Sequence, residues 1–396
     1  MKEYVYIVSG VRTAIGRYGG SLRQFTTSEL GSVAIKEAVK RAEILPEQVE
    51  EVILGEVRQS TESANVARVA ALSAGIPVEV PAYTINRLCS SSMEAMYSGC
   101  LRIMTGEADI IVAGGVESLS RSPHYLRNVR WGDGQARLVD SNVEGATRAQ
   151  PVEIYGPDLG MGMTAEYVAE KYNISREDQD EFALRSHRLT TKAIGEGKFK
   201  DEIVPVEVVI KRKTSIFDTD EHVRPDTTLE ALARLKPAFK PGGTVTAGNS
   251  CGRNDGSAAM VLASDKAVKA LGLAPLARLL GFCAVGVDPR YMGIGPVPAV
   301  TKLLGKLGLK MDDIDLIELN EAFASQSLAC IRELGMDINR TNVNGGAIAL
   351  GHPLGASGCR ISVSLLYEMK RRNGKFGLAA LCTGGGQGMA AVMENV

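Results

Sequence analysis

The sequence is poor in aromatic residues and histidine, and its charges nearly cancel. Of 396 residues, 5% are aromatic, one is Trp and four are His, and the formal net charge is -1. This balance gives no basic surface for nucleic acid and no electrostatic attraction to an anionic membrane. We therefore expect neither nucleic acid nor a membrane as a partner.

Long apolar runs and paired cysteines are also lacking, and no leader segment is expected. No apolar run reaches the roughly 20 residues of a membrane-spanning helix. The chain begins MKEYVYIVSG, which predicts a strand and no signal peptide. The seven cysteines are scattered, odd in number and without a CxxC pair, so neither a disulfide framework nor a metal site is expected. These features predict a cytoplasmic protein with free thiols.

Alternating strand and helix signals are abundant, and they indicate an α/β fold. Residues 52–57 and 82–85 have the short apolar pattern of buried strands, and Thr26 with Glu29 predicts a capping box at a helix start. The last third of the chain repeats this alternation. The length suggests two or three domains, and strands alternating with helices imply parallel pairing in a layered sheet.

A weak internal repeat divides the chain. ADIIVAGG (108–115) and GLAALCTGGG (377–386) each carry a buried strand into paired glycines, and each follows a predicted helix. Between the repeats, residues 121–162 lose the alternation and are rich in Gly, Pro, Asn and Asp. We expect two similar halves that face each other, with an insertion between them.

Cys89 lies in NRLCSSSMEA (86–95), directly before a predicted helix. Free cysteine is often simply buried. However, the partial positive charge at a helix start lowers the pKa of a thiol, and the small residues Ser90 to Ser92 would leave the sulfur accessible. Cys89 is therefore a candidate nucleophile.

His352 lies in GGAIALGHPLGASG (345–358), bracketed by Gly351 and Pro353. A lone histidine is more often structural than catalytic, but this one is held on a tight turn of the kind that approaches a ligand. The internal repeat places it near Cys89, where it could accept the thiol proton.

Cys382 and Asn320 follow two further predicted strands. Cys382 begins CTGGGQG (382–388), which lacks GxGxxG spacing, so its glycines suit a small oxyanion better than a nucleotide phosphate. Asn320 begins NEAF (320–323). It either caps a helix or provides a polar group at the carboxyl edge of a sheet, where active sites gather.

Together these motifs closely resemble the thiolase family, over essentially the whole chain. The resemblance rests on VRTAIGRYGG (11–20), NRLCSSSMEA, VAGGVESLS (112–120), MGMTAE (161–166), GGTVTAGN (242–249), MGIGPVPA (292–299), NEAF, NGGAIALGHPLGASG (344–358) and CTGGGQG. It implies the thiolase fold, in which two similar αβαβα layered halves with mixed sheets carry an inserted loop domain that covers coenzyme A (CoA). The implied bounds are 1–120, completed by about 253–274, for the first half, 121–252 for the loop domain and 275–396 for the second half.

The resemblance also implies a role for each candidate. Cys89 takes the acyl group, His352 is its base, and Cys382 is the acid/base that serves the enolate. Asn320, through a bound water, and His352 form one oxyanion hole, while the backbone N–H groups of Cys89 and Gly384 form another. The implied co-substrate is CoA, with no permanently bound cofactor and no metal.

The CoA path is implied in the same way. For its Met and Phe residues, ordinary core packing is the equal alternative, and Cys251 stands where a serine that contacts pantetheine is usual, which puts that contact in question. The implied lining residues are Arg224, Met161, Phe239, Ala247, Cys251, Met292 and Phe323.

Departures from the biosynthetic members favour the fatty-acid-oxidation branch. Ser92 and Gly160 replace a glycine and a histidine of those enzymes. We expect cleavage of 3-ketoacyl-CoA by CoA, reversible as a Claisen condensation. The alternatives are a short-chain acetoacetyl-CoA thiolase and a catalytically silent acyl-CoA-binding protein. The resemblance further implies a homodimer or a dimer of dimers, with a β-oxidation partner subunit as another possibility.

Overall fold

The computed structural model describes residues 4–132, 134–210 and 212–396. Its strands are β1 (Val5–Thr13), β2 (Gly16–Arg17), β3 (Glu51–Gly55), β4 (Ala82–Ile85), β5 (Ile110–Ser118), β6 (His124–Arg127), β7 (Arg137–Asp140), β8 (Ile203–Val204), β9 (Val206–Ile210), β10 (Lys213–Phe217), β11 (Asn254–Ser264), β12 (Ala277–Gly286), β13 (Leu316–Leu319), β14 (Phe376–Thr383) and β15 (Gln387–Asn395).

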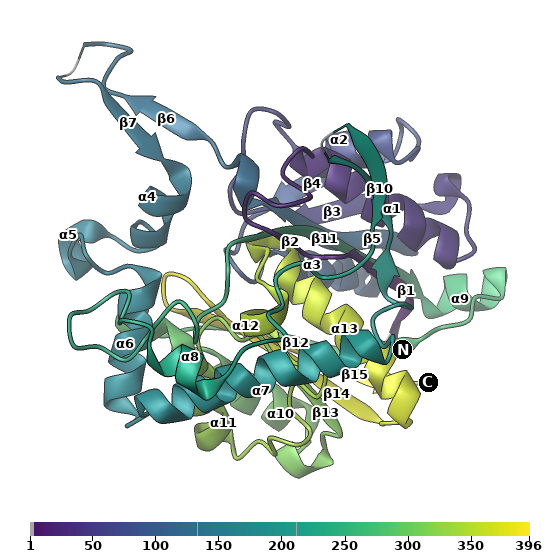
Figure 1. Cartoon of the computed structure of the whole chain (residues 1–396). Helices are drawn as coiled ribbons and strands as arrows, with labels where there is room; N and C mark the ends of the chain where they lie inside the picture. Colours follow the sequence, from purple (N-terminus) through teal and green to yellow (C-terminus); the bar gives the residue numbers. More distant parts are fainter. Residues whose placement is uncertain (1–3, 133, 211) are drawn as a thin grey trace.

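Along the chain, helices alternate with groups of these strands (Figure 1). They are α1 (Thr27–Arg41), α2 (Val66–Ser73), α3 (Ser91–Thr105), α4 (Ser141–Thr147), α5 (Val152–Tyr155), α6 (Met161–Lys171), α7 (Arg176–Gly195), α8 (Leu229–Ala233), α9 (Asp265–Leu271), α10 (Pro296–Leu307), α11 (Ala324–Leu334), α12 (Ala347–Leu350) and α13 (Ser357–Arg372), with short 3-10 turns η1 (Pro46–Gln48), η2 (Leu119–Arg121), η3 (Pro289–Ile294), η4 (Met311–Asp313) and η5 (Leu354–Ala356).

The strand order shows the expected internal repeat. The large sheet runs β4-β3-β5-β11-β1-β12-β15-β14-β13. In the first half, β3 and β5 are parallel, and β11 and β1 follow as antiparallel neighbours. In the second half, β13 and β14 are parallel, and β15 and β12 follow as antiparallel neighbours. The halves join where residues 5–7 of β1 pair with residues 277–279 of β12. The mixed sheets predicted for the two halves are therefore present, and they form one continuous sheet.

Alternating side chains build the layers. On β11, Ala259, Val261 and Ala263 pack toward α1 and α2, whereas Met260 and Leu262 pack toward α3 and α13. A third cluster packs α10 and α11 against the outer face of the second half. Because side chains alternate along a strand, each half-sheet buries both faces, and α3 and α13 occupy the central layer between the halves.

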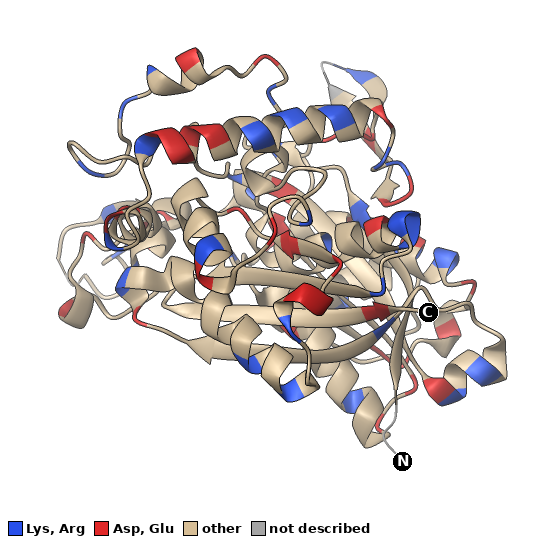
Figure 2. Cartoon of the chain, turned by 90° about the horizontal axis from the view of Figure 1, so that it is seen from below, with Lys and Arg blue, Asp and Glu red and all other residues tan. Residues whose placement is uncertain are grey.

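Local hydrogen bonds fix the helix starts, and the capping box predicted at Thr26 and Glu29 is confirmed. The Thr26 hydroxyl accepts the Glu29 N–H, and the Glu29 carboxylate accepts the Thr26 N–H, completing the capping box of α1. Ser175 caps α7 by accepting the Asp178 N–H at 3.0 Å. Helix α7, along the top of Figure 2, is acidic in its first turn and basic in its last, as its dipole favours.

The middle of the chain departs from the sequence-based expectations. Residues 121–162 contain the β6–β7 hairpin, which projects from the body, together with α4 and α5. All four residues of β6 are exposed, so no alternating pattern marked that strand. Further along the chain, residues 203–210 form two strands, β8 and β9. Among the described residues, no helix is both long and apolar enough to cross a bilayer.

Candidate active site

The turn before Cys89 is strained. Leu88 has φ 46°, a left-handed conformation that bulky residues rarely adopt. Ser91 holds this turn, because its hydroxyl donates to the Leu88 carbonyl at 2.6 Å and accepts the Arg87 N–H at 2.9 Å. The turn delivers Cys89 to the start of α3, where the residue is partly exposed.

All three serines after Cys89 are fully buried, and each makes a structural contact. The Ser90 hydroxyl is hydrogen-bonded to the Thr383 hydroxyl, next to Cys382. The Ser92 hydroxyl accepts the Cys359 N–H at 2.9 Å on α13. The serines therefore do more than leave space around the sulfur: they tie the nucleophile turn to β14 and α13.

The electrostatic environment of Cys89 differs from the sequence-based expectation. Although the residue as a whole is partly exposed, the protein packs densely around its thiol. This burial raises the pKa of the thiol above the ordinary value, whereas the N–H groups of Gly384 and Cys89 and the charge of Arg58 act in the opposite direction. Burial dominates over the helix start. A thiol whose pKa is raised above the ordinary value is a weaker acid, so a base is needed to form the nucleophilic thiolate.

His352 is buried on the η5 side of α13, and its backbone N–H donates to Asn254 Oδ1 at 3.0 Å. Its Nδ1 lies 2.6 Å from Ser357 Oγ. Within the described chain its Nε2 has no hydrogen-bond partner. Burial, with a smaller effect from Arg360, lowers the pKa of His352 to about 3. The imidazole is therefore neutral and offers one unpartnered nitrogen.

Asn320 and Cys382 lie at neighbouring strand ends. The parallel register pairs Leu319 with Ala380, and the Asn320 N–H donates to the Ala380 carbonyl at 2.9 Å. Asn320 is 1% exposed, and its Nδ2 has no partner among the described residues. A buried amide donor without a partner is unusual, so both Asn320 Nδ2 and His352 Nε2 are available to a ligand or water.

Cys382 is buried and electrostatically linked to two other thiols. Burial, followed by the effect of Cys89, raises the pKa of Cys382 well above its ordinary value. Burial and Cys89 likewise raise the pKa of Cys251 to about 12. The Ser90–Thr383 hydrogen bond joins the residues next to Cys89 and Cys382. Ala322, which contacts Cys251, belongs to the same apolar cluster as Cys382. Cys251 is anchored there by donating its N–H to the Ala322 carbonyl at 3.0 Å.

Several candidates for the CoA path form one apolar cluster with Cys382. Met292 and Phe323 are buried in this cluster, and Met161 packs against it. Phe239 lies edge-on to Phe323, with ring centroids 6.2 Å apart. The structure therefore brings three of the predicted lining residues into one cluster with Cys382, and Phe239 packs on Phe323 at the edge of that cluster.

Two other candidates lie outside that apolar cluster. Ala247 is exposed in the loop between α8 and β11. Arg224 is also exposed, and its backbone N–H donates to His187 Nδ1 at 3.2 Å. Their positions leave both side chains accessible, as contacts with a ligand require.

Gly384 begins the glycine run after Cys382. A Cβ at this position would lie 3.1 Å from Leu88 Cδ1 and 3.4 Å from Met161 Sδ. The run therefore brings a backbone N–H to Cys89 between side chains of the nucleophile turn and α6. Gly385, with φ 74°, turns the chain immediately afterwards.

No role was predicted from the sequence for the residues that hold these loops. Glu117 is fully buried, and its carboxylate accepts the N–H groups of Arg58 at 2.9 Å and Gly355 at 2.8 Å. Ser357 and Asn254 hold His352 from its two sides. Glu117 lies near the end of β5, after an apolar run that is visible in the sequence. A carboxylate at that position was the one sequence signal that could have indicated its role.

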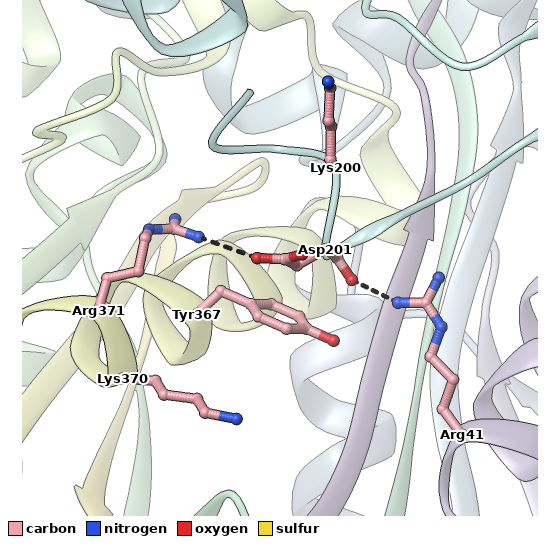
Figure 3. Close-up of a pocket in the computed structure, with 6 residues that line it drawn as sticks. All are labelled: Arg41, Lys200, Asp201, Tyr367, Lys370 and Arg371. Atoms are coloured by element: carbon pink, nitrogen blue, oxygen red, sulfur yellow. Dashed lines mark hydrogen bonds and ion pairs between the residues drawn. The ribbon is translucent and has the colours of Figure 1, made fainter. Parts of the chain in front are cut away.

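A cavity of about 700 Å³ has a different lining (Figure 3). Its cations come largely from the last turns of α1 and α13, where basic residues complement the helix dipoles. Asp201 occupies the space between them, with its carbonyl accepting from Arg41 and its carboxylate 3.9 Å from Arg371. Arg41 and Arg371 are also paired with Glu37 and Glu368, and we do not assign the cavity to the active site. It is lined by Arg41, Lys200, Asp201, Tyr367, Lys370 and Arg371.

Comparisons with known proteins agree with this geometry. The family model for the thiolase N-terminal domain matches residues 5–266, and that for the thiolase C-terminal domain matches residues 273–395. The chain is 48% identical over 400 residues to an acetyl-CoA acetyltransferase of Syntrophomonas wolfei, covering 100% of both chains. It is 46% identical to the mitochondrial 3-ketoacyl-CoA thiolase of Homo sapiens, covering 99% of this chain and 98% of that one.

A solved structure shows the same fold. The human mitochondrial 3-ketoacyl-CoA thiolase in complex with CoA superposes with a TM-score of 0.94 at 46% identity, covering 100% of this chain and 98% of that chain. The matches span both halves and the segment between them. The chain belongs to the thiolase family of acyltransferases.

Proposed function

We propose that the protein cleaves 3-ketoacyl-CoA with CoA, yielding acetyl-CoA and a shortened acyl-CoA, and that the reaction is reversible as a Claisen condensation. One observation carries the proposal. Two buried polar atoms, His352 Nε2 and Asn320 Nδ2, have no partner among the described residues, and they occur in a site that also contains two candidate catalytic thiols. A base and a free donor are what carbon–carbon cleavage through an enolate requires.

In the first half-reaction, the Cys89 sulfur attacks the 3-keto carbon as its proton passes to His352. The backbone N–H groups of Cys89 and Gly384 stabilise the oxyanion that forms there. The bond between C2 and C3 then breaks, and Cys382 protonates the departing acetyl-CoA enolate. Asn320, through a water, and His352 stabilise the enolate oxygen.

In the second half-reaction, the CoA thiol attacks the acyl group on Cys89. The Cys382 thiolate takes the proton of the CoA thiol, the C–S bond to the enzyme breaks, His352 returns its proton to Cys89, and acyl-CoA leaves. Because acyl transfer to the enzyme precedes attack by CoA, the kinetics are ping-pong.

The CoA site that we propose follows the apolar cluster beside Cys382. Met161, Met292 and Phe323 line the pantetheine path, with Phe239 at its exposed end. Cys251, Ala247 and Arg224 complete the set, with Arg224 toward the nucleotide. A CoA complex of a 46% identical relative supports CoA as co-substrate.

The degradative direction is a finer part of the proposal. Relatives of both names have similar identity to this chain, so identity alone does not separate them. Ser92 supports the degradative branch with a specific contact, since its hydroxyl accepts the Cys359 N–H, and glycine would remove that acceptor. The second candidate function is a short-chain acetoacetyl-CoA thiolase, which the S. wolfei relative's name favours.

We also propose the domain bounds, assembly and compartment. The halves comprise 1–120 with about 253–274, and 275–396, and the loop domain comprises 121–252.

The short edge strand β4 and the apolar residues exposed on the β6–β7 hairpin suit a homodimer that pairs into a tetramer. Replacing Trp131, which is 81% exposed, by Ser should then lower the mass measured by light scattering to that of a dimer. The proposed compartment is the cytoplasm.

Thiolysis kinetics test the substrate. We expect kcat/KM to rise from acetoacetyl-CoA to 3-ketohexanoyl-CoA and 3-ketodecanoyl-CoA. A sharp preference for acetoacetyl-CoA would select the second candidate, and activity with none of the three would reject both.

Two variants test the residue roles. Cys89→Ala should form no acyl-enzyme while still binding CoA. Cys382→Ala should still be acylated by acetyl-CoA but should not condense it. A labelled acetyl group trapped on another cysteine of Cys89→Ala, or wild-type condensation by Cys382→Ala, would contradict the assignments.

A further inference from the structure

Arg360 lies directly behind the candidate oxyanion site. It is 2% exposed on α13, three positions after Ser357. Its Nη2 lies 3.5 Å from Asn320 Oδ1, and its Nη1 lies 3.8 Å from a carboxylate oxygen of Glu318. A buried guanidinium thus faces the amide of Asn320 from the side of the strand.

The chemistry of the two groups fixes the orientation of the amide. A guanidinium has hydrogen-bond donors and no acceptor, so only the oxygen of an amide is favourable beside it. With Oδ1 toward Arg360, the Asn320 NH₂ group must face the opposite way. That is the group without a partner among the described residues.

We propose that Arg360 is a positioning residue that turns the Asn320 amide so that its NH₂ group faces the substrate. This inference rests on the proposed function, in which Asn320 acts as a donor through water toward the enolate oxygen. If the amide rotated by half a turn, an acceptor would face a developing negative charge. Arg360 prevents that rotation without touching the substrate.

The surroundings of Arg360 agree with a role beyond packing. Its Nε and Nη1 make no hydrogen bonds within the described chain, whereas a buried arginine with a purely structural role is normally hydrogen-bonded throughout. Its charge also contributes, after burial, to the lowered pKa of His352. One cation therefore affects both groups of the proposed enolate site.

Three substitutions separate orientation from packing. Lys at position 360 offers only donors, Gln offers a donor and an acceptor, and Met offers neither. Arg360→Lys should retain most thiolysis, whereas Arg360→Gln and Arg360→Met should lose about 10²-fold or more, the usual effect of losing an oxyanion donor. Arg371→Met, at a partly exposed position of the same helix, is the matched control and should match the wild type.

A second readout shows which half-reaction is affected. Exchange of labelled CoA into acetyl-CoA needs acylation of Cys89 but no enolate, so the Gln and Met variants should retain it within about tenfold. Equal losses in exchange and thiolysis would show a merely structural role and overturn the inference. Thiolysis by Arg360→Met within about twofold of the wild type would also overturn it.

A double-mutant cycle tests whether Arg360 acts through Asn320. Arg360→Met combined with Asn320→Ala should be no worse in thiolysis than Asn320→Ala alone, and additive losses would contradict the coupling. If neither neutral variant folds, Asn320→Asp replaces them. A carboxylate beside Arg360 has no donor to turn toward substrate, so retained thiolysis would overturn the inference. A wild-type protein inactive in both assays would instead reject the proposed function.

Discussion

His352 Nδ1 lies 2.6 Å from Ser357 Oγ, and the Ser357 hydroxyl donates to the Pro353 carbonyl at 2.8 Å. A hydroxyl has one proton to donate. With that proton on Pro353, Nδ1 must be the donor to Ser357, and Nε2 carries the free lone pair. Ser357 thereby selects the tautomer in which the unpartnered Nε2 can accept a proton from a thiol.

Replacing Ser357 by Ala should slow acylation of Cys89 by about tenfold or more, because a correctly placed base contributes at least that much. The measurement is rapid-quench formation of the acyl-enzyme from acetyl-CoA. Ser362→Ala is the matched control, since Ser362 is equally buried on α13 and donates only to the Gly358 carbonyl. Equal acylation rates in the two variants would refute the tautomer assignment.

Adjacent glycines should respond differently to alanine. At Gly384 the new methyl would meet Leu88 and Met161 side chains at 3.1 and 3.4 Å, so small shifts accommodate it and Tm should change little. The shift of Leu88 displaces the nucleophile turn, and kcat should fall. At Gly385 the methyl would lie 2.5 Å from the Ala149 carbonyl oxygen, with φ 74°.

Gly385→Ala should therefore lower the free energy of unfolding by about 1–3 kcal/mol, the usual range for backbone strain. Thermal unfolding and thiolysis rates of both variants check the contrast. A larger loss of Tm in Gly384→Ala than in Gly385→Ala would contradict it.

The sequence predicted features that depend on neighbours in the chain. Thr26 and Glu29 are three positions apart, and their capping box is where it was expected. The strand predicted before Cys382 was recognisable from its apolar run. It is β14, which extends through Cys382 to Thr383. Ser90, in contrast, meets Thr383, 293 positions away. No local pattern encodes such a contact.

Dependence on distant parts of the chain also explains why the sequence predicted the wrong direction for the pKa of the Cys89 thiol. A helix start is visible in the sequence, and it predicted a lowered pKa. The depth of burial depends on how both halves and the loop segment close around the sulfur, and that burial raises the pKa instead. The candidate residues were therefore accessible from the sequence, whereas their electrostatics and their supports needed the fold.

Glu117 should be intolerant of an isosteric change. Its buried carboxylate accepts three backbone N–H groups, from Val57, Arg58 and Gly355. Glutamine would direct an NH₂ group at one of these donors and leave it unsatisfied, which costs about 1–3 kcal/mol.

Denaturant unfolding of Glu117→Gln measures that cost. Glu62→Gln is the control, because Glu62 is exposed and pairs with Arg121 at the surface, where loss of an ion pair changes stability by about 1 kcal/mol or less. If the two variants unfold at the same denaturant concentration, Glu117 is not the anchor inferred here.

His187 should make the stability of the protein depend on pH. Burial, with smaller effects from His222 and Arg224, lowers the pKa of His187 to about 4. As pH falls below about 6.5, the unfolded chain binds a proton at this residue before the folded chain does. The stabilising contribution is therefore complete above about pH 6.5 and is lost progressively toward pH 4.

His187→Gln keeps an acceptor for the Arg224 N–H but cannot titrate, so its Tm should fall less steeply than that of the wild type over this range. His124→Gln, on the exposed strand β6, is the control and should keep the wild-type slope. Parallel Tm curves for His187→Gln and the wild type would show that His187 does not contribute to acid destabilisation.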